Sequence, residues 1–195
     1  MSGRKQFDVD AAVDQAMRVF WERGYADTSL DSLSAATGLG RGSLYGAFGN
    51  KESLFTQCLD RYASVYGARW EQALAAHPHD PVRSIEAFFA AILDRMADPS
   101  VPAGCLIVQS AAQSATLSAE SGARVRSMIA AQRQRIRTSL ADSSADCRSL
   151  DELATFVVAV NQSLAVLSRI GSPDSELRSV ARLACATVAD AITAS

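Results

Sequence analysis

The sequence predicts an all-α protein with two parts, a small N-terminal unit of three helices and a larger helical body. Apolar residues recur at intervals of three and four along almost the whole chain of 195 residues, and Gly or Pro residues separate these stretches. In addition, two helices of about eight residues follow each other around a glycine turn before residue 50. We therefore expect one domain over residues 1–50 and a second over residues 51–195.

The first predicted helix begins after a short arm. Asp8 or Asp10 can cap it, because an aspartate side chain accepts hydrogen bonds from the free amides of a first turn. Gly24 is placed to end it. The apolar residues between these limits form one stripe at helical spacing: Val9, Ala12, Val13, Ala16, Met17 and Phe20.

The second and third predicted helices form a pair around a tight turn. Thr28 or Ser29 can cap the second helix, and the glycines of segment 38–40 allow the left-handed backbone that closes a helix. The third helix covers residues 41–48, and Asn50 can cap a fourth. Helix, glycine turn and second helix over about twenty residues form a helix-turn-helix unit, whose second helix is the one that enters a DNA major groove. The apolar positions of the pair are Leu30, Leu33, Ala36, Leu39, Leu44 and Phe48.

Beyond residue 50 the sequence predicts a long helix and then a bundle. The long helix continues to about Ala76, because no Pro interrupts it, and segment 77–81 is a Pro-rich linker. Pro99 and Pro102 break the chain again after the next helix. The expected helices of the bundle cover residues 82–97, 104–115, 118–141, 150–170 and 173–192.

A dense, ordered pattern of residues runs through the N-terminal quarter of the chain. It consists of Ala16 to Phe20, Gly24-Tyr25, Thr28-Ser29, Leu33-Ser34, Thr37-Gly38-Leu39, Gly42-Ser43-Leu44-Tyr45, Phe48, Lys51-Glu52 and Leu54-Phe55. In this pattern the chain resembles the TetR family of bacterial transcriptional regulators. The resemblance implies a homodimer whose helix-turn-helix units bind a palindromic operator in double-stranded DNA and block transcription until a small-molecule effector spreads them.

The net charge of −2 offers no overall attraction to DNA, and residues 1–60 hold six Lys and Arg against eight Asp and Glu. Binding must therefore depend on a few placed groups. We expect Arg41 to read a base, and Lys51, Tyr45 and the Thr28 hydroxyl to hold phosphates. Small residues of the recognition helix would allow close approach, with the Ala47 methyl facing thymine. The complete predicted DNA-binding set is Thr28, Ser29, Arg41, Gly42, Ser43, Tyr45, Gly46, Ala47 and Lys51.

Aromatic residues spaced by four along the long helix have two readings. Tyr62, Tyr66 and Trp70 can pack as core, or they can line a small-molecule pocket between helices. Glutamines on the short apolar helix would add polar groups to such a pocket. The predicted ligand-binding residues are Tyr62, Tyr66, Trp70, Phe89, Met96, Gln109 and Gln113.

The last two predicted helices are the expected dimer interface. Segment 150–170 is apolar on more than one face, which a solvent-exposed helix would not tolerate. Within it, Asn161 and Gln162 can serve either the pocket or a hydrogen bond across the interface, and we favour the interface. The predicted interface residues are Phe156, Val160, Leu164, Leu167, Val180, Ala184 and Val188.

Other classes of function find little support. The glycines of segment 38–42 lack the strand and spacing of a phosphate-binding loop, and the two histidines, His77 and His79, lie in a Pro-flanked linker. We expect no catalysis, metal or cofactor. With four scattered cysteines, no signal peptide and no long apolar run, the chain is expected to be cytoplasmic, with reduced thiols and no membrane partner. The alternative from another class is a helical protein-interaction module without an effector.

Overall fold

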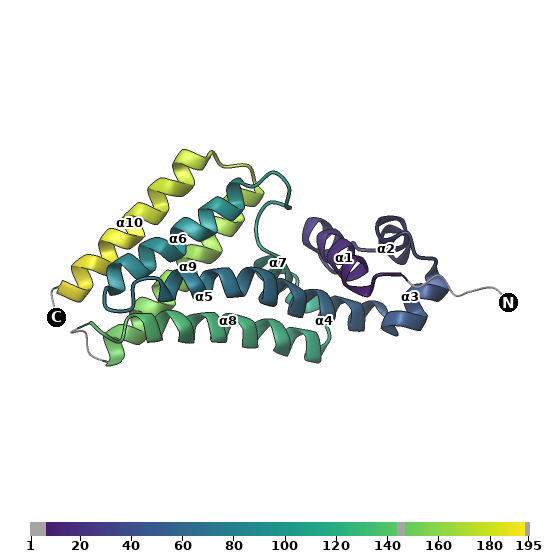
Figure 1. Ribbon diagram of the computed structural model, residues 1–195, viewed down its shortest axis with the longest axis horizontal. Helices are drawn as coiled ribbons and strands as arrows, with labels where there is room; N and C mark the ends of the chain where they lie inside the picture. The colour runs from purple at the N-terminus through teal and green to yellow at the C-terminus, as the bar shows by residue number, and fades with distance from the viewer. Residues whose placement is uncertain (1–6, 144–146, 194–195) are drawn as a thin grey trace.

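The computed structural model describes residues 7–143 and 147–193, and helices dominate this part of the chain (Figure 1). The described part contains no strand. The helices are α1 (Val9–Arg23), α2 (Leu30–Thr37), α3 (Arg41–Phe48), α4 (Lys51–Tyr62), the π-helical turn η1 (Ala63–Gly67), α5 (Ala68–Ala75), α6 (Pro81–Ala97), α7 (Leu106–Ala112), the 3-10 turn η2 (Ser114–Thr116), α8 (Ala119–Ser139), α9 (Cys147–Arg169) and α10 (Asp174–Thr193).

Helices α1 to α3 form the head at one end of the molecule (Figure 1). Asp8 caps α1 through a 3.1 Å bond from the Ala11 amide, and Ser29 caps α2 with a reciprocal bond to Ser32. Gly38, with a φ of 66°, ends α2 in the left-handed conformation, as the sequence predicts. The head core does not stop at residue 50, because it also contains Leu54, Phe55, Cys58 and Leu59 of α4.

A nearly continuous helical rod, made of α4, η1 and α5, connects the head to the body (Figure 1). The sequence predicts one α-helix to about Ala76, whereas the structure inserts the π-helical turn at residues 63–67. Such turns occur mostly as single-turn bulges within α-helices and are frequent at functional sites. Periodicity of apolar residues cannot reveal one extra residue per turn over so short a segment.

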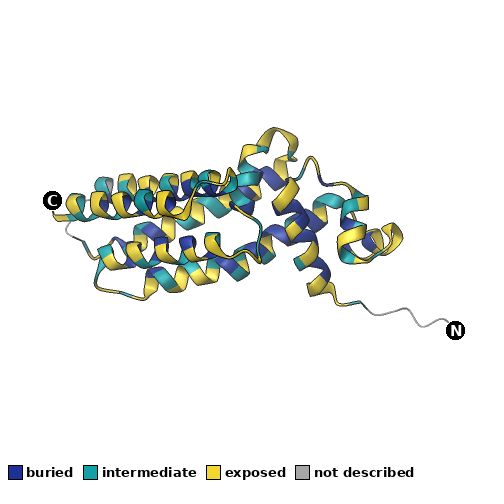
Figure 2. Cartoon of the chain, turned by 90° about the horizontal axis from the view of Figure 1, so that it is seen from above, coloured by how far each residue is buried: buried dark blue, intermediate teal, exposed yellow. Residues whose placement is uncertain are grey.

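The body consists of the long helices α6, α8, α9 and α10 beside α5. Buried residues face inward between these helices, while their outer faces are exposed (Figure 2). Helix α9 lies between α8 and α10, which explains why it is apolar on several sides. Residues 149–169 are long and apolar enough to cross a membrane by length and composition alone, but 44% of this window is buried inside the protein.

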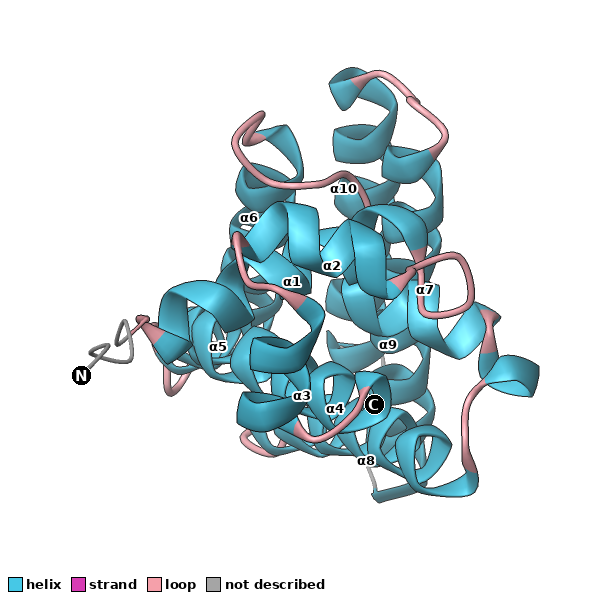
Figure 3. Cartoon of the chain, turned by 90° about the vertical axis from the view of Figure 1, so that its right-hand side faces the viewer, coloured by secondary structure: helices cyan, strands magenta, loops and turns pink. Residues whose placement is uncertain are grey.

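Short helix α7 lies at the junction of head and body. It contacts α1, α4, α8 and α9, and Figure 3 views this junction from the end of the molecule that carries the head. Gly104, just before it, has a φ of 81°, and a side chain there would meet the Ala165 carbonyl. The chain therefore enters α7 through a turn that only glycine fits comfortably.

Candidate nucleic-acid interface and internal cavity

Recognition helix α3 presents one free face to solvent. Leu44 and Phe48 are buried in the head core. The remaining side chains are exposed, and Tyr45 keeps 48% of its surface accessible. A Cβ added at Gly42 or Gly46 would meet nothing within 4 Å. The exposed face of α3 consists of Arg41, Gly42, Ser43, Tyr45, Gly46 and Ala47, all six of which the sequence predicts as DNA-binding.

Arg41, at the start of α3, is held by a carboxylate of α2. Its Nη2 lies 2.5 Å and its Nε 2.9 Å from Oδ1 of Asp31. Both side chains are largely exposed, at 61% and 71%. An exposed ion pair contributes little to stability, so Arg41 can exchange this partner for a DNA group at low cost.

Thr28 lies inside the head and does not present its hydroxyl to solvent. Its side chain is only 1% exposed, and Oγ1 donates to the Gly24 carbonyl at 2.6 Å. The expectation that this hydroxyl holds a phosphate is therefore not supported by the geometry. Ser29 is exposed, but its hydroxyl serves as the cap of α2.

Lys51 begins α4 beside the recognition helix. Its Nζ lies 4.4 Å from the centroid of the Tyr25 ring, a cation–π contact. Partial burial lowers the pKa of this ammonium, and the nearby Asp27 carboxylate acts in the opposite direction. Lys51 thus stands at a helix N-terminus where free amides and a cation combine, which suits a phosphate.

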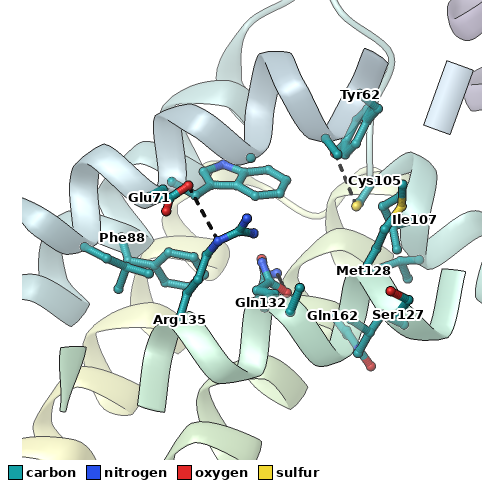
Figure 4. Close-up of a pocket in the computed structure, with 18 of the residues that line it drawn as sticks. Tyr62, Glu71, Phe88, Cys105, Ile107, Ser127, Met128, Gln132, Arg135 and Gln162 are labelled. Atoms are coloured by element: carbon teal, nitrogen blue, oxygen red, sulfur yellow. Dashed lines mark hydrogen bonds and ion pairs between the residues drawn. The ribbon is translucent and has the colours of Figure 1, made fainter. Parts of the chain in front are cut away.

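The body contains a cavity of about 210 Å³, partly open to solvent, between the rod, α6, α7, α8 and α9 (Figure 4). Its walls are mostly apolar, and the π-helical turn contributes Ala63 and Gly67. The lining residues are Tyr62, Ala63, Gly67, Trp70, Glu71, Leu74, Phe88, Cys105, Ile107, Val108, Arg124, Ser127, Met128, Ile129, Ala131, Gln132, Arg135, Asn161 and Gln162.

Most polar groups of the cavity are paired within the chain. Asn161 donates to Gln132 Oε1 at 3.4 Å, so it serves the cavity wall and not the interface that the sequence favours. Arg135 Nε lies 3.5 Å from Glu71 Oε2 (Figure 4). Complete burial raises the pKa of the Tyr62 phenol, which stays protonated and donates to Cys105 Sγ at 3.2 Å.

Only two of the seven predicted ligand-binding residues, Tyr62 and Trp70, line this cavity. Tyr66, within the π-helical turn, packs edge-on against Trp21 of α1 at 5.4 Å between ring centroids and does not line the cavity. Phe89 is core between α6 and α10, and Met96 packs against the core. Neither glutamine of α7 reaches the cavity: Gln109 lies outside it, and Gln113 contacts the head.

The predicted interface residues of α9 and α10 divide into inner and outer sets. Leu164, Ala184 and Val188 are 0%, 3% and 0% exposed and belong to the core of a single chain. Within one chain they therefore leave almost no surface for a partner to contact. Val160, Leu167 and Val180 are partly buried against the same core, and Phe156 is exposed. Val166, Ile170 and Leu183, which are not among the predicted interface residues, are 51%, 73% and 57% exposed.

A helix-turn-helix head with a free recognition helix, joined by a rod to a helical body with an internal cavity, defines the class of DNA-binding transcriptional regulators. The sequence model described as "Bacterial regulatory proteins, tetR family" matches residues 12–58. A second one, "Tetracyclin repressor-like, C-terminal domain", matches residues 81–184. The chain belongs to the TetR family, as its N-terminal motifs predict.

Full-length relatives and solved structures agree with this assignment. The transcriptional repressor ComR of Escherichia coli K12 is 33% identical over 91% of this chain and 87% of its own. The TetR family regulator CifR, solved as a cysteine mutant with 26 bp of operator DNA, is 30% identical with a TM-score of 0.85 over 94% of this chain and 98% of its own. A TetR regulator of Chloroflexus aurantiacus is 28% identical with a TM-score of 0.80 over 91% and 92%.

Proposed function

We propose that the protein is a ligand-responsive repressor, which binds a palindromic operator as a homodimer and leaves it when a small molecule occupies the internal cavity. The observation that carries the proposal is the rod. Its first half, α4, completes the core of the DNA-binding head, and residues 62–74 form one wall of the cavity. A change in the cavity therefore acts on the element that orients the head.

The DNA side of the proposal depends on the exposed face of α3 and on Lys51. Arg41 would read a base from the groove floor after it leaves Asp31, and Lys51 and Tyr45 would hold phosphates. Repression is supported by the relatives, since ComR carries that description and CifR has been solved on its operator.

The dimer would form through the outer faces of α9 and α10. On α9, exposed apolar and small residues recur at intervals of three and four, and Leu183 lies on the exposed face of α10. Two copies of these helices would make a four-helix interface around a two-fold axis. The α9 stripe is Phe156, Ala159, Ser163, Val166 and Ile170.

The effector is proposed to be a small uncharged aromatic compound. The walls supply Trp70 and Phe88 for ring contacts, and the amides of Gln132 and Gln162 offer neutral hydrogen bonds. The two arginines of the cavity already have carboxylate partners, Asp60 for Arg124 and Glu71 for Arg135. These partners already neutralise both guanidinium charges, so the cavity offers an anionic ligand no unpaired cation among its described lining residues.

The proposal is tested in two stages. Selection of bound fragments from a random DNA pool would give the operator and its half-site spacing; only non-specific binding would contradict the repressor reading. With that operator, 2-naphthol and the carboxylate 2-naphthoate are then compared as releasing agents. Release by 2-naphthol at lower concentration is the expected result, and preference for 2-naphthoate would overturn the uncharged class.

A helical interaction module without an effector is the competing function. It predicts that no small molecule changes operator binding and that filling the cavity has no effect beyond stability. As a repressor of chromosomal operators the protein would act in the cytoplasm.

A further inference from the structure

Helix α7 touches the cavity with one end and the DNA-binding head with the other. Ile107 and Val108 in its first turn line the cavity. Gln113, its C-terminal cap, reaches the turn between α1 and α2, 87 residues earlier in the chain. Ile107 and Gln113 are six residues apart, a distance of about 9 Å along a helix.

The contact of Gln113 with the head is close. Its Oε1 accepts a hydrogen bond of 3.4 Å from the Ala26 amide. A Cβ built on Gly24 would lie 2.4 Å from both Nε2 and Oε1 of Gln113, so the amide group lies flat on the Gly24 backbone. Gly24 is buried and has a φ of 79°, which glycine alone adopts readily.

The turn that Gln113 contacts, residues 24–26, leads directly into the helix-turn-helix. The Gly24 carbonyl accepts the 2.6 Å bond from the Thr28 hydroxyl, and Ser29 follows as the cap of α2. The position of Gly24 therefore fixes where α2 begins. Because α2 contacts α3, this turn is linked to the recognition helix through α2.

The N-terminal end of α7 is also tied to the head. Arg95, only 6% exposed, donates to the Gly104 carbonyl at 2.6 Å and lies 5.4 Å from the Trp21 ring of α1. Beside it, Cys105 accepts the Tyr62 hydroxyl. Between these contacts α7 contains neither Gly nor Pro, so no residue in it favours a kink or a break.

We propose that Gln113 is a positioning residue that transmits occupancy of the cavity to the helix-turn-helix. A ligand that pushes on Ile107 and Val108 displaces α7 and withdraws Gln113 from the segment 24–26. The start of α2 is then released from the conformation that binds DNA. This inference rests on the proposed effector role of the cavity, and it requires the ligand to favour the released state.

In the test, a larger side chain fills the cavity in place of the unidentified effector. Val108→Trp overfills the cavity from α7 itself, and overpacking is relieved by shifts of the backbone. It should weaken operator binding of the full-length protein by about 5-fold or more, the lower end of usual coupling. In the Gln113→Ala background the same change should weaken binding less than about 2-fold. Amide exchange of segment 24–33, measured by mass spectrometry, should increase with Val108→Trp or Gln113→Ala and not increase further in the double variant.

Two controls separate coupling from damage. Gln113→Glu keeps an oxygen that accepts from the Ala26 amide and should restore the response to Val108→Trp. Gln109→Ala, one turn earlier on the same helix, should leave that response unchanged. Circular dichroism melting of every variant identifies any that simply unfold.

The outcomes distinguish this inference from the proposed function. Equal weakening by Val108→Trp with and without Gln113 would overturn the role of Gln113 and leave the effector cavity standing. If neither Val108→Trp nor 2-naphthol changed operator binding in the parent, the regulatory role of the cavity would fall, and the inference with it. A response lost with Gln113→Ala and regained with Gln113→Glu supports both.

Discussion

Arg41 illustrates how a single side chain can be held ready for DNA. The ion pair with Asp31 fixes the guanidinium beside the exposed face of α3 at little gain in stability. We predict that Arg41→Ala lowers discrimination at one operator base pair by about tenfold, as expected for loss of a bidentate base contact. Sequencing of fragments selected by parent and variant measures this directly. Uniform weakening over all sequences would instead assign Arg41 to a phosphate.

The partner of Arg41 provides the matched variant. Asp31→Asn frees the guanidinium and removes a negative charge from the DNA-facing side, so the affinity for operator and non-operator DNA should rise together. A fall in operator affinity would mean that Asp31 orients Arg41 for reading.

Lys51 tests the phosphate contacts. Lys51→Ala should weaken binding to every sequence similarly and reduce the slope of log affinity against log salt by about one unit. Lys51→Arg keeps the charge and should preserve the slope. An unchanged slope in Lys51→Ala would show that the ammonium serves only the Tyr25 ring that it faces at 4.4 Å.

Residue type alone predicts where a side chain can act, but not which way it faces. Arg41 and Tyr45 are exposed, because Arg41 begins the helix at its solvent end and Tyr45 lies beside the buried face of Leu44 and Phe48. Thr28 and Gln113 are polar residues near predicted sites, yet both bond to the backbone around Gly24. Those contacts depend on how distant helices meet, which no local pattern records.

Helix α3 contains two glycines, which lower the stability of the helix but leave its backbone open to a close approach of DNA. No neighbour within 4 Å requires a glycine at 42 or 46, and neither position has a positive φ. We predict that Gly46→Ala stabilises the free protein by up to about 1 kcal/mol, measured by urea denaturation, because glycine is a poor helix former. Gly46→Leu should then lose operator binding, since a large side chain keeps the backbone from the groove. Parent-like binding by Gly46→Leu would reject the close approach.

Most helices could be predicted because caps and breakers mark their ends. Asp8, Ser29, Asn50, Asp80 and Ser118 each cap the helix that follows. No such residue marks the π-helical turn, and Tyr66 within it packs against Trp21 instead of lining the cavity. The extent of the head was likewise underestimated, because α4 contributes to its core after the Asn50 cap.

At the scale of the whole molecule, the head is tied to the body from three sides. The rod contributes α4 residues to the head core, and Gln113 after α7 accepts a hydrogen bond from the turn between α1 and α2. Arg169 of α9 donates to the carbonyls of Trp21 and Glu22 at 3.0 and 2.6 Å. The last contact satisfies free carbonyls at the C-terminal end of α1 with a cation. Helix α9 therefore both supports the head and carries the proposed interface.

Because each head is fixed to its own body, the spacing of the two heads in the proposed dimer is set by the interface of α9 and α10. Dimeric helix-turn-helix proteins must hold their recognition helices about 34–36 Å apart to meet successive major grooves. Val166, 51% exposed on the α9 stripe, can be replaced without disturbing the core, whereas Leu164 is 0% exposed and cannot.

Val166→Arg should place unpaired charges near the two-fold axis, weaken the dimer at least about tenfold and reduce DNA binding to a weak, non-specific level. Gln72→Arg adds the same charge to an exposed position of α5 and should leave both properties intact. Sedimentation measures the dimer dissociation constant of each variant. A dimer of parental strength in Val166→Arg would mean that the protomers meet through another surface.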